Sequence, residues 1–517
     1  MAKSYVDYMN ELTADDLYKG FLAHGLFCEK LPPVFSSEAF FDYCKLFKAP
    51  FDDKPKQYVS FSSMRNINEP RQFAIPNPMA YQKLCRCLAD NWTYLQSHFQ
   101  DKTGLQTHKI SRIHIRKLYN SEKIFEMDYT NLQIIPTPNL QHIEKIFDMN
   151  YKNWKDDPSP EPDLRIGMKF TVKADIASCF PSMYTHALAW ALAGKATAKR
   201  NRTPTDWFNQ IDRCTQQMRY GETHGFFIGP HTSNLLSEII LTCIDFELVQ
   251  RGWKFIRNVD DYICFIKTYD EGQIFLAELN KHLRSYDLLL NHKKTEILEL
   301  PATADQWVYQ INAASELLKS ENIKYSQLSD FIDIAVELMR NNKNNAAILN
   351  YAIKILRGKQ LTDNAKEYCC KTFMHLALIY PYLVPLLEEN LFEHYKINNN
   401  SISEFSSHLF DDGCKLQNFE AVYFAIYYAI KYGFALDKLT QDIAINSEDC
   451  LVLLFAYKYF EKYGDKKSVK ILKDHAKKLK DDDFDKYWIF AYEILPKSEL
   501  TGAWKQMKEK GITFLNI

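Results

Sequence analysis

The stretch RNVDDYICF, residues 257–265, sets two adjacent aspartates, Asp260 and Asp261, between two short apolar runs. The runs at 255–259 and 262–266 are typical of the strands of a hairpin, with the acids at its tip. Aspartate is common in turns, so a solvated turn is one explanation. The other is a pair of carboxylates placed for chemistry, and the rest of the chain decides between them.

A third acid follows a second strand pattern, in KFTVKADIASCF at 169–180. Apolar side chains alternate from Phe170 to Ile176, so Asp175 projects from the opposite face near the strand end, and Pro181 can open a helix. The helix start also allows Asp175 to be only a helix cap.

Three carboxylates would converge if this strand neighbours the hairpin. Two unit charges ~4 Å apart at an effective dielectric constant of ~20 repel by about 4 kcal/mol, so a divalent cation is expected between them. Oxygen-only ligation completed by phosphate suits Mg²⁺. Two such ions ~3.5–4 Å apart can activate an attacking oxygen and stabilise a leaving pyrophosphate.

The composition is that of a globular protein of two or three domains. The chain has 517 residues, 46% apolar and 25% charged, and a net charge of −1. Any contact with nucleic acid must therefore depend on a local basic patch. No apolar window has the length of a membrane span or a signal peptide, and the twelve cysteines lack zinc-ligand spacing. We expect a cytoplasmic protein with free or buried thiols and no membrane contact.

Helical patterns dominate after a break near Pro301. Apolar residues with helical spacing start at Phe331 and again at Ile348, and two segments end in Lys-Tyr-Gly, at Gly433 and Gly464, 31 residues apart. Stacked helical hairpins and an irregular helical bundle both fit this pattern. We expect two domains, 1–300 and 301–517.

Four segments occur in a telling order: DIASCF at 175–180, GFFIGPHTSNLLSE at 225–238, VDDY at 259–262 and LLLNHKKTEIL at 288–298. They resemble motifs A to D of a reverse-transcriptase palm, and RQFAIPNPMAYQKL at 71–84 resembles the preceding fingers motif. GKATAKRNR, ETHG, IGPHTS and the helical C-terminal half resemble the bacterial abortive-infection (Abi) polymerases. The resemblance covers roughly residues 20–300.

This resemblance implies an α+β fold of reverse-transcriptase-like fingers and palm, followed by an all-α, helical-repeat-like domain. It implies DNA synthesis from dNTPs with Mg²⁺, or Mn²⁺ in its place, in antiphage defence. The synthesis would be template-independent and primed by a protein hydroxyl, so that single-stranded DNA is attached to the chain, and a homo-oligomer is expected. Alternatives are an RNA-templated reverse transcriptase with a partner RNA and a non-catalytic palm scaffold.

Site residues follow from the matched motifs. Asp175 and Asp260 would be metal ligands, and Asp261 would assist or hold the turn. Lys294, with Lys293 as the alternative, would approach the triphosphate and protonate pyrophosphate. Phe180, five residues after Asp175, would be a steric gate against the ribose 2′-hydroxyl, or else a core phenylalanine.

Further nucleotide contacts are expected from motif B and the fingers. Gly229 and Pro230 would line the nucleotide and template path, although the segment departs from the proline-glutamine-glycine of many relatives. Arg71, and secondarily Arg65, would reach the triphosphate. The run Lys195, Lys199, Arg200 and Arg202 would contact phosphates or form a solvated loop, and His224 and His231 are expected to be structural.

The priming hydroxyl is expected in SYVDYMNE, residues 4–11, because a polar terminus is often mobile. Tyr8 is preferred over Tyr5 since it lies nearer the folded body. Tyr18 and Tyr184 are fallback sites, and a surface tyrosine without a role is the alternative for each.

Overall fold

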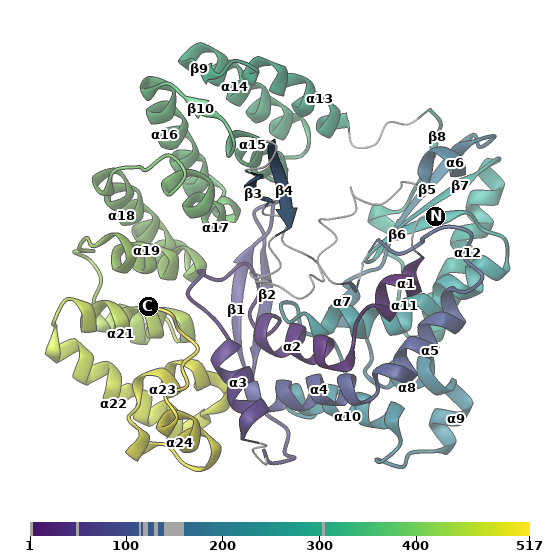
Figure 1. Ribbon diagram of the computed structural model, residues 1–517, viewed down its shortest axis with the longest axis horizontal. Helices are drawn as coiled ribbons and strands as arrows, with labels where there is room; N and C mark the ends of the chain where they lie inside the picture. The colour runs from purple at the N-terminus through teal and green to yellow at the C-terminus, as the bar shows by residue number, and fades with distance from the viewer. Residues whose placement is uncertain are drawn as a thin grey trace. The chain divides into compact units, whose positions relative to one another are not determined.

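The computed structural model describes residues 4–47, 51–112, 115–116, 123–128, 133–138, 160–301 and 306–517. The chain forms two compact units (Figure 1). The first comprises Met1–Cys28, Ser36–Gln57 and Pro76–Ala302, and the second comprises Glu29–Phe35, Tyr58–Ile75 and Thr303–Ile517. Two short N-terminal segments thus cluster with the C-terminal half. The predicted domains at 1–300 and 301–517 stay a prediction.

The first unit is built on a four-stranded antiparallel sheet in the order β6-β7-β5-β8. Its strands are β5 (Phe170–Asp175), β6 (Phe255–Asn258), β7 (Asp261–Ile266) and β8 (Glu296–Glu299). The hairpin predicted around the two aspartates is β6–β7, and its turn consists of Val259 and Asp260. A separate hairpin pairs β3 (Lys123–Asp128) with β4 (Gln133–Pro138).

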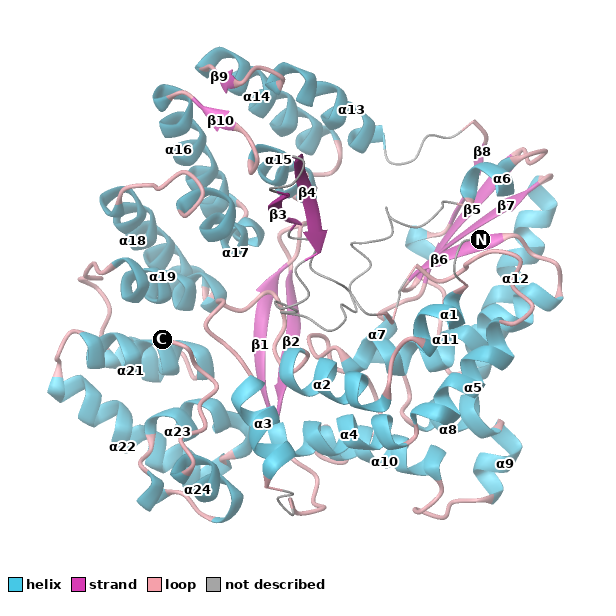
Figure 2. Cartoon of the chain, in the orientation of Figure 1, coloured by secondary structure: helices cyan, strands magenta, loops and turns pink. Residues whose placement is uncertain are grey.

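The other regular elements described in this unit are helices (Figure 2). They are α1 (Tyr5–Asn10), α2 (Ala14–His24), α3 (Glu38–Leu46), α4 (Pro78–Asp90), α5 (Trp92–Thr103), α6 (Glu161–Arg165), α7 (Cys179–Ser182), α8 (His186–Ala193), α9 (Lys195–Arg200), α10 (Trp207–Met218), α11 (Thr232–Gln250) and α12 (Tyr269–Ser285), with the 3₁₀ turn η2 (His292–Lys294).

Two helices position the sheet. Most of α11 is buried, and it packs against α5, α8 and α12. Helix α12 contacts β5 and β7. A β-carbon at Gly272 of α12 would lie 2.7 Å from Ile266 and 2.9 Å from Ile297, so glycine lets this helix approach the sheet closely.

The second unit is largely helical, as the C-terminal periodicity predicts. Its helices are α13 (Gln306–Ala314), α14 (Tyr325–Asn341), α15 (Ala347–Leu356), α16 (Asp363–Ile379), α17 (Val384–Leu387), α18 (Asn399–Leu416), α19 (Phe419–Tyr432), α20 (Gln441–Asn446), α21 (Cys450–Lys462), α22 (Lys466–Asp483), α23 (Trp488–Ile494) and α24 (Gly502–Glu509). Gly433 ends α19 at a φ of 76°, a left-handed conformation that glycine adopts without strain.

A β-hairpin belongs to this helical unit by its contacts. It pairs β1 (Tyr58–Met64) with β2 (Pro70–Pro76), while β9 (Asn322–Ile323) pairs with β10 (Gln360–Leu361). The buried carboxyl of Glu420 on α19 accepts hydrogen bonds from the Ser63 hydroxyl at 2.6 Å and the Met64 N–H at 2.7 Å. These bonds fix β1 against α19.

Candidate active site

Asp175 and Asp261 face each other as register partners on neighbouring strands. β5 and β7 run antiparallel, and Asp175 at the end of β5 pairs with Asp261 at the start of β7. Asp175 is 4% exposed, whereas Asp261 is exposed. The acids from two distant segments therefore meet at one edge of the sheet, as expected if the strands are neighbours.

The turn that carries Asp260 has a strained backbone. Val259 adopts a φ of 57°, in the left-handed region that β-branched residues rarely occupy. The carbonyl oxygen of Asp260 accepts a hydrogen bond from the N–H of Ile176 at 3.2 Å, just after Asp175. The turn is thus tied to the end of β5, which brings both aspartates of the hairpin beside Asp175.

Lys294 contacts the predicted catalytic carboxylate. Its Nζ lies 2.6 Å from Oδ2 of Asp175, and the amide Nδ2 of Asn291 donates to the same oxygen at 3.1 Å. The Asn291 N–H also donates to the Asp175 carbonyl at 2.7 Å. Of the two lysines that the sequence left open, Lys294 is the one whose ammonium contacts Asp175.

The three carboxylates are chemically suitable ligands for a divalent metal ion. Asp175, Asp260 and Asp261 offer only oxygen donors, and Mg²⁺ commonly uses one or two carboxylates with water and substrate phosphates. An ammonium already lies on Asp175, which shows that this oxygen accepts a cation. Within the described ranges, no group of three or more His, Cys, Asp and Glu side chains is arranged to hold a metal. Water and phosphate oxygens would therefore have to complete the metal coordination.

The segment that carries Phe180 is joined to motif B. Ser178, before α7, has a φ of 47°, which turns the chain sharply after β5. The N–H of Phe226 donates to the Phe180 carbonyl at 2.7 Å, and that of Gly225 donates to Met183 at 2.7 Å. Phe180 itself is half-buried, so its ring keeps an accessible part. Its role as a steric gate stays a prediction.

Gly229 and Pro230 form the turn that leads into α11. Gly229 has a φ of 130°, which favours glycine, and Pro230 is buried. The next residue, His231, donates its N–H to the carbonyl of Gly25 at 2.9 Å. A β-carbon at Gly25 would lie 2.8 Å from Cβ of His231, so the two segments need glycine at this contact.

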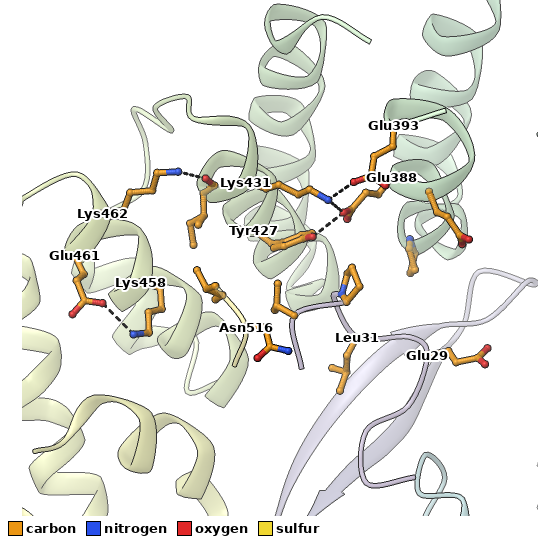
Figure 3. A pocket seen from close by; sticks show the side chains of 16 residues that line it. Glu29, Leu31, Glu388, Glu393, Tyr427, Lys431, Lys458, Glu461, Lys462 and Asn516 are labelled. Carbon is orange, nitrogen blue, oxygen red and sulfur yellow. Dashed lines mark hydrogen bonds and ion pairs between the residues drawn. The ribbon is translucent and has the colours of Figure 1, made fainter. Parts of the chain in front are cut away.

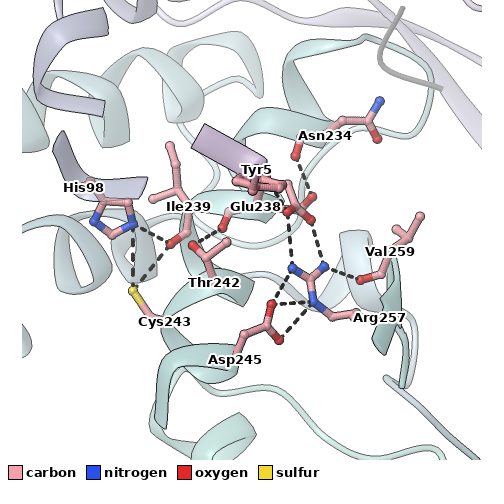
Figure 4. A network of polar contacts seen from close by, with 11 residues as sticks. Tyr5, His98, Asn234, Glu238, Ile239, Thr242, Cys243, Asp245, Arg257 and Val259 are labelled. Carbon is pink, nitrogen blue, oxygen red and sulfur yellow. Dashed lines mark hydrogen bonds and ion pairs between the residues drawn. The ribbon is translucent and has the colours of Figure 1, made fainter. Parts of the chain in front are cut away.

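A buried network of ion pairs supports the hairpin turn, and the sequence analysis did not predict it. Arg257 on β6 is fully buried and lies 2.8 Å from Glu238 and 2.7 Å from Asp245 on α11 (Figure 4). Its Nη1 also donates to the Val259 carbonyl at 2.8 Å, and the Tyr5 hydroxyl donates to Glu238 at 2.7 Å. The network therefore fixes the strained residue that precedes Asp260.

Burial and charge oppose each other in this network. Burial alone would lower the pKa of Arg257, but Asp245 and Glu238 outweigh it and raise the pKa well above the ordinary value. Burial raises the pKa of Asp245, whereas the positive charge of Arg257 lowers it. Two features of the sequence point to this network. Arg257 directly follows the apolar residues Phe255 and Ile256 of a strand pattern, and two acids lie seven residues apart on an apolar helix.

Tyr8 lies in a folded element. Residues 5–10 form α1, which begins with a capping box between Ser4 and Asp7 and packs on α5. The Tyr8 ring lies 4.6 Å from Nζ of Lys109 and 5.0 Å from Cζ of Arg116. A priming role for Tyr8, which stays a prediction, would require α1 to leave α5. The Tyr5 hydroxyl is buried against Glu238.

Arg65 and Arg71 lie on the β1–β2 hairpin of the second unit. The side chain of Arg65 is 3.6 Å from Glu69 near the hairpin tip. Their approach to a triphosphate stays a prediction.

The second unit also contains a cavity of about 920 Å³ lined by glutamates and lysines (Figure 3). Lys431 contacts both Glu388 and Glu393, and the Tyr427 hydroxyl donates to Glu388 at 2.8 Å. The cavity contains none of the predicted site residues.

Comparison with known proteins identifies a domain. Residues 77–326 match the family model described as "Reverse transcriptase (RNA-dependent DNA polymerase)", so the chain contains a reverse-transcriptase domain. No curated protein matches the chain. No helix in the described part of the chain is long and apolar enough to cross a membrane.

Two telomerase structures are similar at 12% identity. One is telomerase from Candida albicans in complex with a TWJ fragment of telomeric RNA, with 72% of this chain and 65% of that chain covered and a TM-score of 0.27. The other is apo telomerase from Candida tropicalis, with 84% and 72% covered and a TM-score of 0.31. The chain thus spans about two thirds of the length of the first of these.

Proposed function

We propose that this chain, which contains a reverse-transcriptase domain, synthesises DNA from dNTPs in antiphage abortive infection, without a template and from a hydroxyl of the protein itself. The observation that carries the polymerase assignment is the meeting of Asp175, Asp260 in the hairpin turn, Asp261 at the start of β7 and Lys294 at one edge of the sheet.

In the proposed reaction, the attacking hydroxyl gives its proton to water, its oxygen forms a bond to the α-phosphorus of a dNTP, and the bond from that phosphorus to the leaving pyrophosphate breaks. Asp175 and Asp260, with help from Asp261, would hold Mg²⁺, which when bound activates the attacking oxygen and neutralises the leaving group. Lys294 donates a proton to the departing pyrophosphate, and its contact with Asp175 keeps the ammonium at the site until then. Phe180 selects the deoxyribose sugar.

Two features support untemplated, self-primed synthesis. The net charge of −1 suits a protein that does not grip a long duplex, and the chain after residue 306 is largely helical, as in the Abi polymerases that the motifs resemble. Tyr8 is the proposed primer, and the product would be single-stranded DNA covalently attached to the chain. A homo-oligomer in the cytoplasm is part of the same proposal.

RNA-templated synthesis is the second candidate, favoured by the description of the matching family. Purified protein incubated with labelled dNTPs and Mg²⁺, without template or primer, separates the two. Labelled product that stays with the protein after denaturation and is released by protease supports the proposal. Product that forms only on an added RNA template supports the second candidate, and no product under either condition contradicts both.

A further inference from the structure

A second cavity lies within the first unit, among α8, α9, α10 and the loop before α10. It has a volume of about 480 Å³, within the roughly 300–1,000 Å³ range of small-molecule sites. Its lining combines cationic, aromatic and amide side chains. They are Tyr184, His186, Trp190, Lys199, Arg202, Asn209, Asp212, Arg213 and Gln216, with Ala189, Ala198 and Pro204.

Cations line one part of the cavity. Lys199 and Arg202 are exposed, and neither forms an ion pair with any residue that the structure describes. Arg213 contacts Asp53, which also holds Lys83 at 3.0 Å. Two cations of the lining are thus available to an anion, and the forked guanidinium of Arg202 matches phosphate geometry.

The loop that carries Arg202 is fixed in place. The amide Nδ2 of Asn209, on α10, donates to the carbonyl of Asn201 at 3.1 Å and to that of Thr203 at 2.9 Å. These two acceptors flank Arg202 on either side. The guanidinium therefore extends from a backbone that is already held, which reduces the ordering needed when an anion binds.

Aromatic rings form another part of the lining. The ring of Tyr184 lies 4.8 Å from His186 and 5.5 Å from Trp190. Nζ of Lys195 covers one face of Trp190 at 3.9 Å. Aromatic faces next to phosphate-binding cations are the combination that binds the base and the phosphate of a nucleotide.

The single acidic residue of the cavity lining, Asp212, already has hydrogen-bond partners. Asp212 is 6% exposed; its Oδ2 lies 2.5 Å from Nδ1 of His186, and its Oδ1 accepts from Nε2 of Gln216 at 2.6 Å. Because an ionised carboxylate only accepts, Nδ1 of His186 is the donor in this pair. The acid therefore orients His186 and Gln216 and does not stand as an uncompensated charge against phosphate.

We infer that this cavity binds a nucleotide, with the base against Tyr184 and Trp190 and the phosphates on Lys199 and Arg202. The ligand is either a free nucleotide or the phosphorylated end of a strand, which share this chemistry. The inference does not depend on the proposed function, because binding here requires neither Asp175 nor polymerisation.

Calorimetric titration of the full chain in EDTA, which silences metal-dependent binding, tests the inference. The probes are dATP, a 5′-phosphorylated thymidine hexamer, inorganic triphosphate and deoxyadenosine. We expect the double variant Lys199→Glu, Arg202→Glu to weaken binding of dATP or the hexamer by about tenfold or more. The double variant Lys281→Glu, Arg284→Glu is the matched control, since both residues are exposed on α12 and do not line the cavity, and its binding should stay within about twofold of wild type.

The outcomes separate the alternatives. Binding of dATP indicates a free nucleotide, and binding of the hexamer alone indicates a strand end; either supports the inference if only the double variant weakens it. Equal loss in the control Lys281→Glu, Arg284→Glu indicates an effect of general surface charge and overturns the inference. Inorganic triphosphate that binds as tightly as dATP, or no binding by dATP and the hexamer, also overturns it.

Discussion

The ammonium of Lys294 lies 2.6 Å from Oδ2 of Asp175, and Asn291 donates to the same oxygen. Lys294 therefore neutralises the most buried of the three aspartates while its own side chain stays 59% exposed. A ligand that takes over this carboxylate oxygen would release the ammonium toward any phosphate beside it. Lys294 is thus suited both to hold the Asp175 carboxylate before a ligand binds and to donate a proton to the leaving pyrophosphate.

Asparagine at Asp175 or Asp260 should abolish nucleotide incorporation. Each change keeps the side-chain shape but removes a charged metal ligand, which we expect to lower the rate by about 100-fold or more. Incorporation of labelled dNTPs by the purified variants measures this. Asp270→Asn, an exposed change on α12, is the control. Wild-type rates in either variant would show that the metal-site assignment is wrong.

Replacing Lys294 by methionine should lower the rate constant for incorporation by about 100-fold, the lower end of general acid contributions. Lys293→Met should leave the rate constant within about twofold, because the ammonium that contacts Asp175 belongs to Lys294. Single-turnover kinetics with saturating dNTP provide the measurement. Equal losses in the two variants would assign the effect to general charge near the site.

Phe180→Ala should admit rNTPs, because removing the ring opens space at the 2′ position. We expect the preference for dNTP over rNTP to fall by about tenfold or more, as kcat/KM for the two substrates would show. Since Phe180 is half-buried, the unfolding midpoint of the variant must be measured beside the kinetics. An unchanged preference in a folded variant removes the steric-gate role.

Arg257→Met should destabilise the first unit by about 3–5 kcal/mol, because it leaves Glu238 and Asp245 buried without their cation. Arg251→Met removes the pair between the exposed Arg251 and the half-buried Glu278, which are 3.4 Å apart, and should cost no more than about 1 kcal/mol. Urea unfolding followed by circular dichroism compares the two. Similar small losses would mean that the network is not a source of stability.

Glu420 should make the stability of the second unit depend on pH. Burial raises its pKa from 4.5 to about 7, while the hydrogen bonds from Ser63 and Met64 act in the opposite direction. Between these pH values the folded chain keeps a proton that the unfolded chain has released. The free energy of unfolding should therefore fall as the pH rises from about 4.5 to about 7, by about 3 kcal/mol in total, and then level off.

Glu420→Gln should remove this dependence, since its amide does not titrate and the Ser63 hydroxyl can still bond to it. Glu404→Gln, at an exposed position of α18, should retain it. Urea unfolding at several pH values between about 5 and 8 measures each slope. The same slope in wild type and Glu420→Gln would rule out Glu420 as its source.

Local patterns predicted much of the four-stranded sheet. The alternation of apolar residues from Phe170 predicted β5, and the apolar runs on either side of Asp260 predicted β6 and β7. Such strands can be predicted because their periodicity depends only on residues that are close in sequence. Asp261, however, lies in β7 and only Asp260 lies in the turn. The partners of Arg257 could not be predicted, since they come from another element 12 and 19 residues away. Nor does the polarity of SYVDYMNE reveal that it forms α1 against α5.

The bond between Ser63 and Glu420 joins residues 357 positions apart. On the ribosome, β1 must wait for its partner until most of the chain has been made, a delay of roughly 20–70 s at synthesis rates of about 5–20 residues per second. During that time the edges of β1 and β2 lack their final contact with α19. A chaperone that holds nascent chains would therefore find its substrate in residues 58–75, and ribosome stalling before residue 420 would lengthen the exposure.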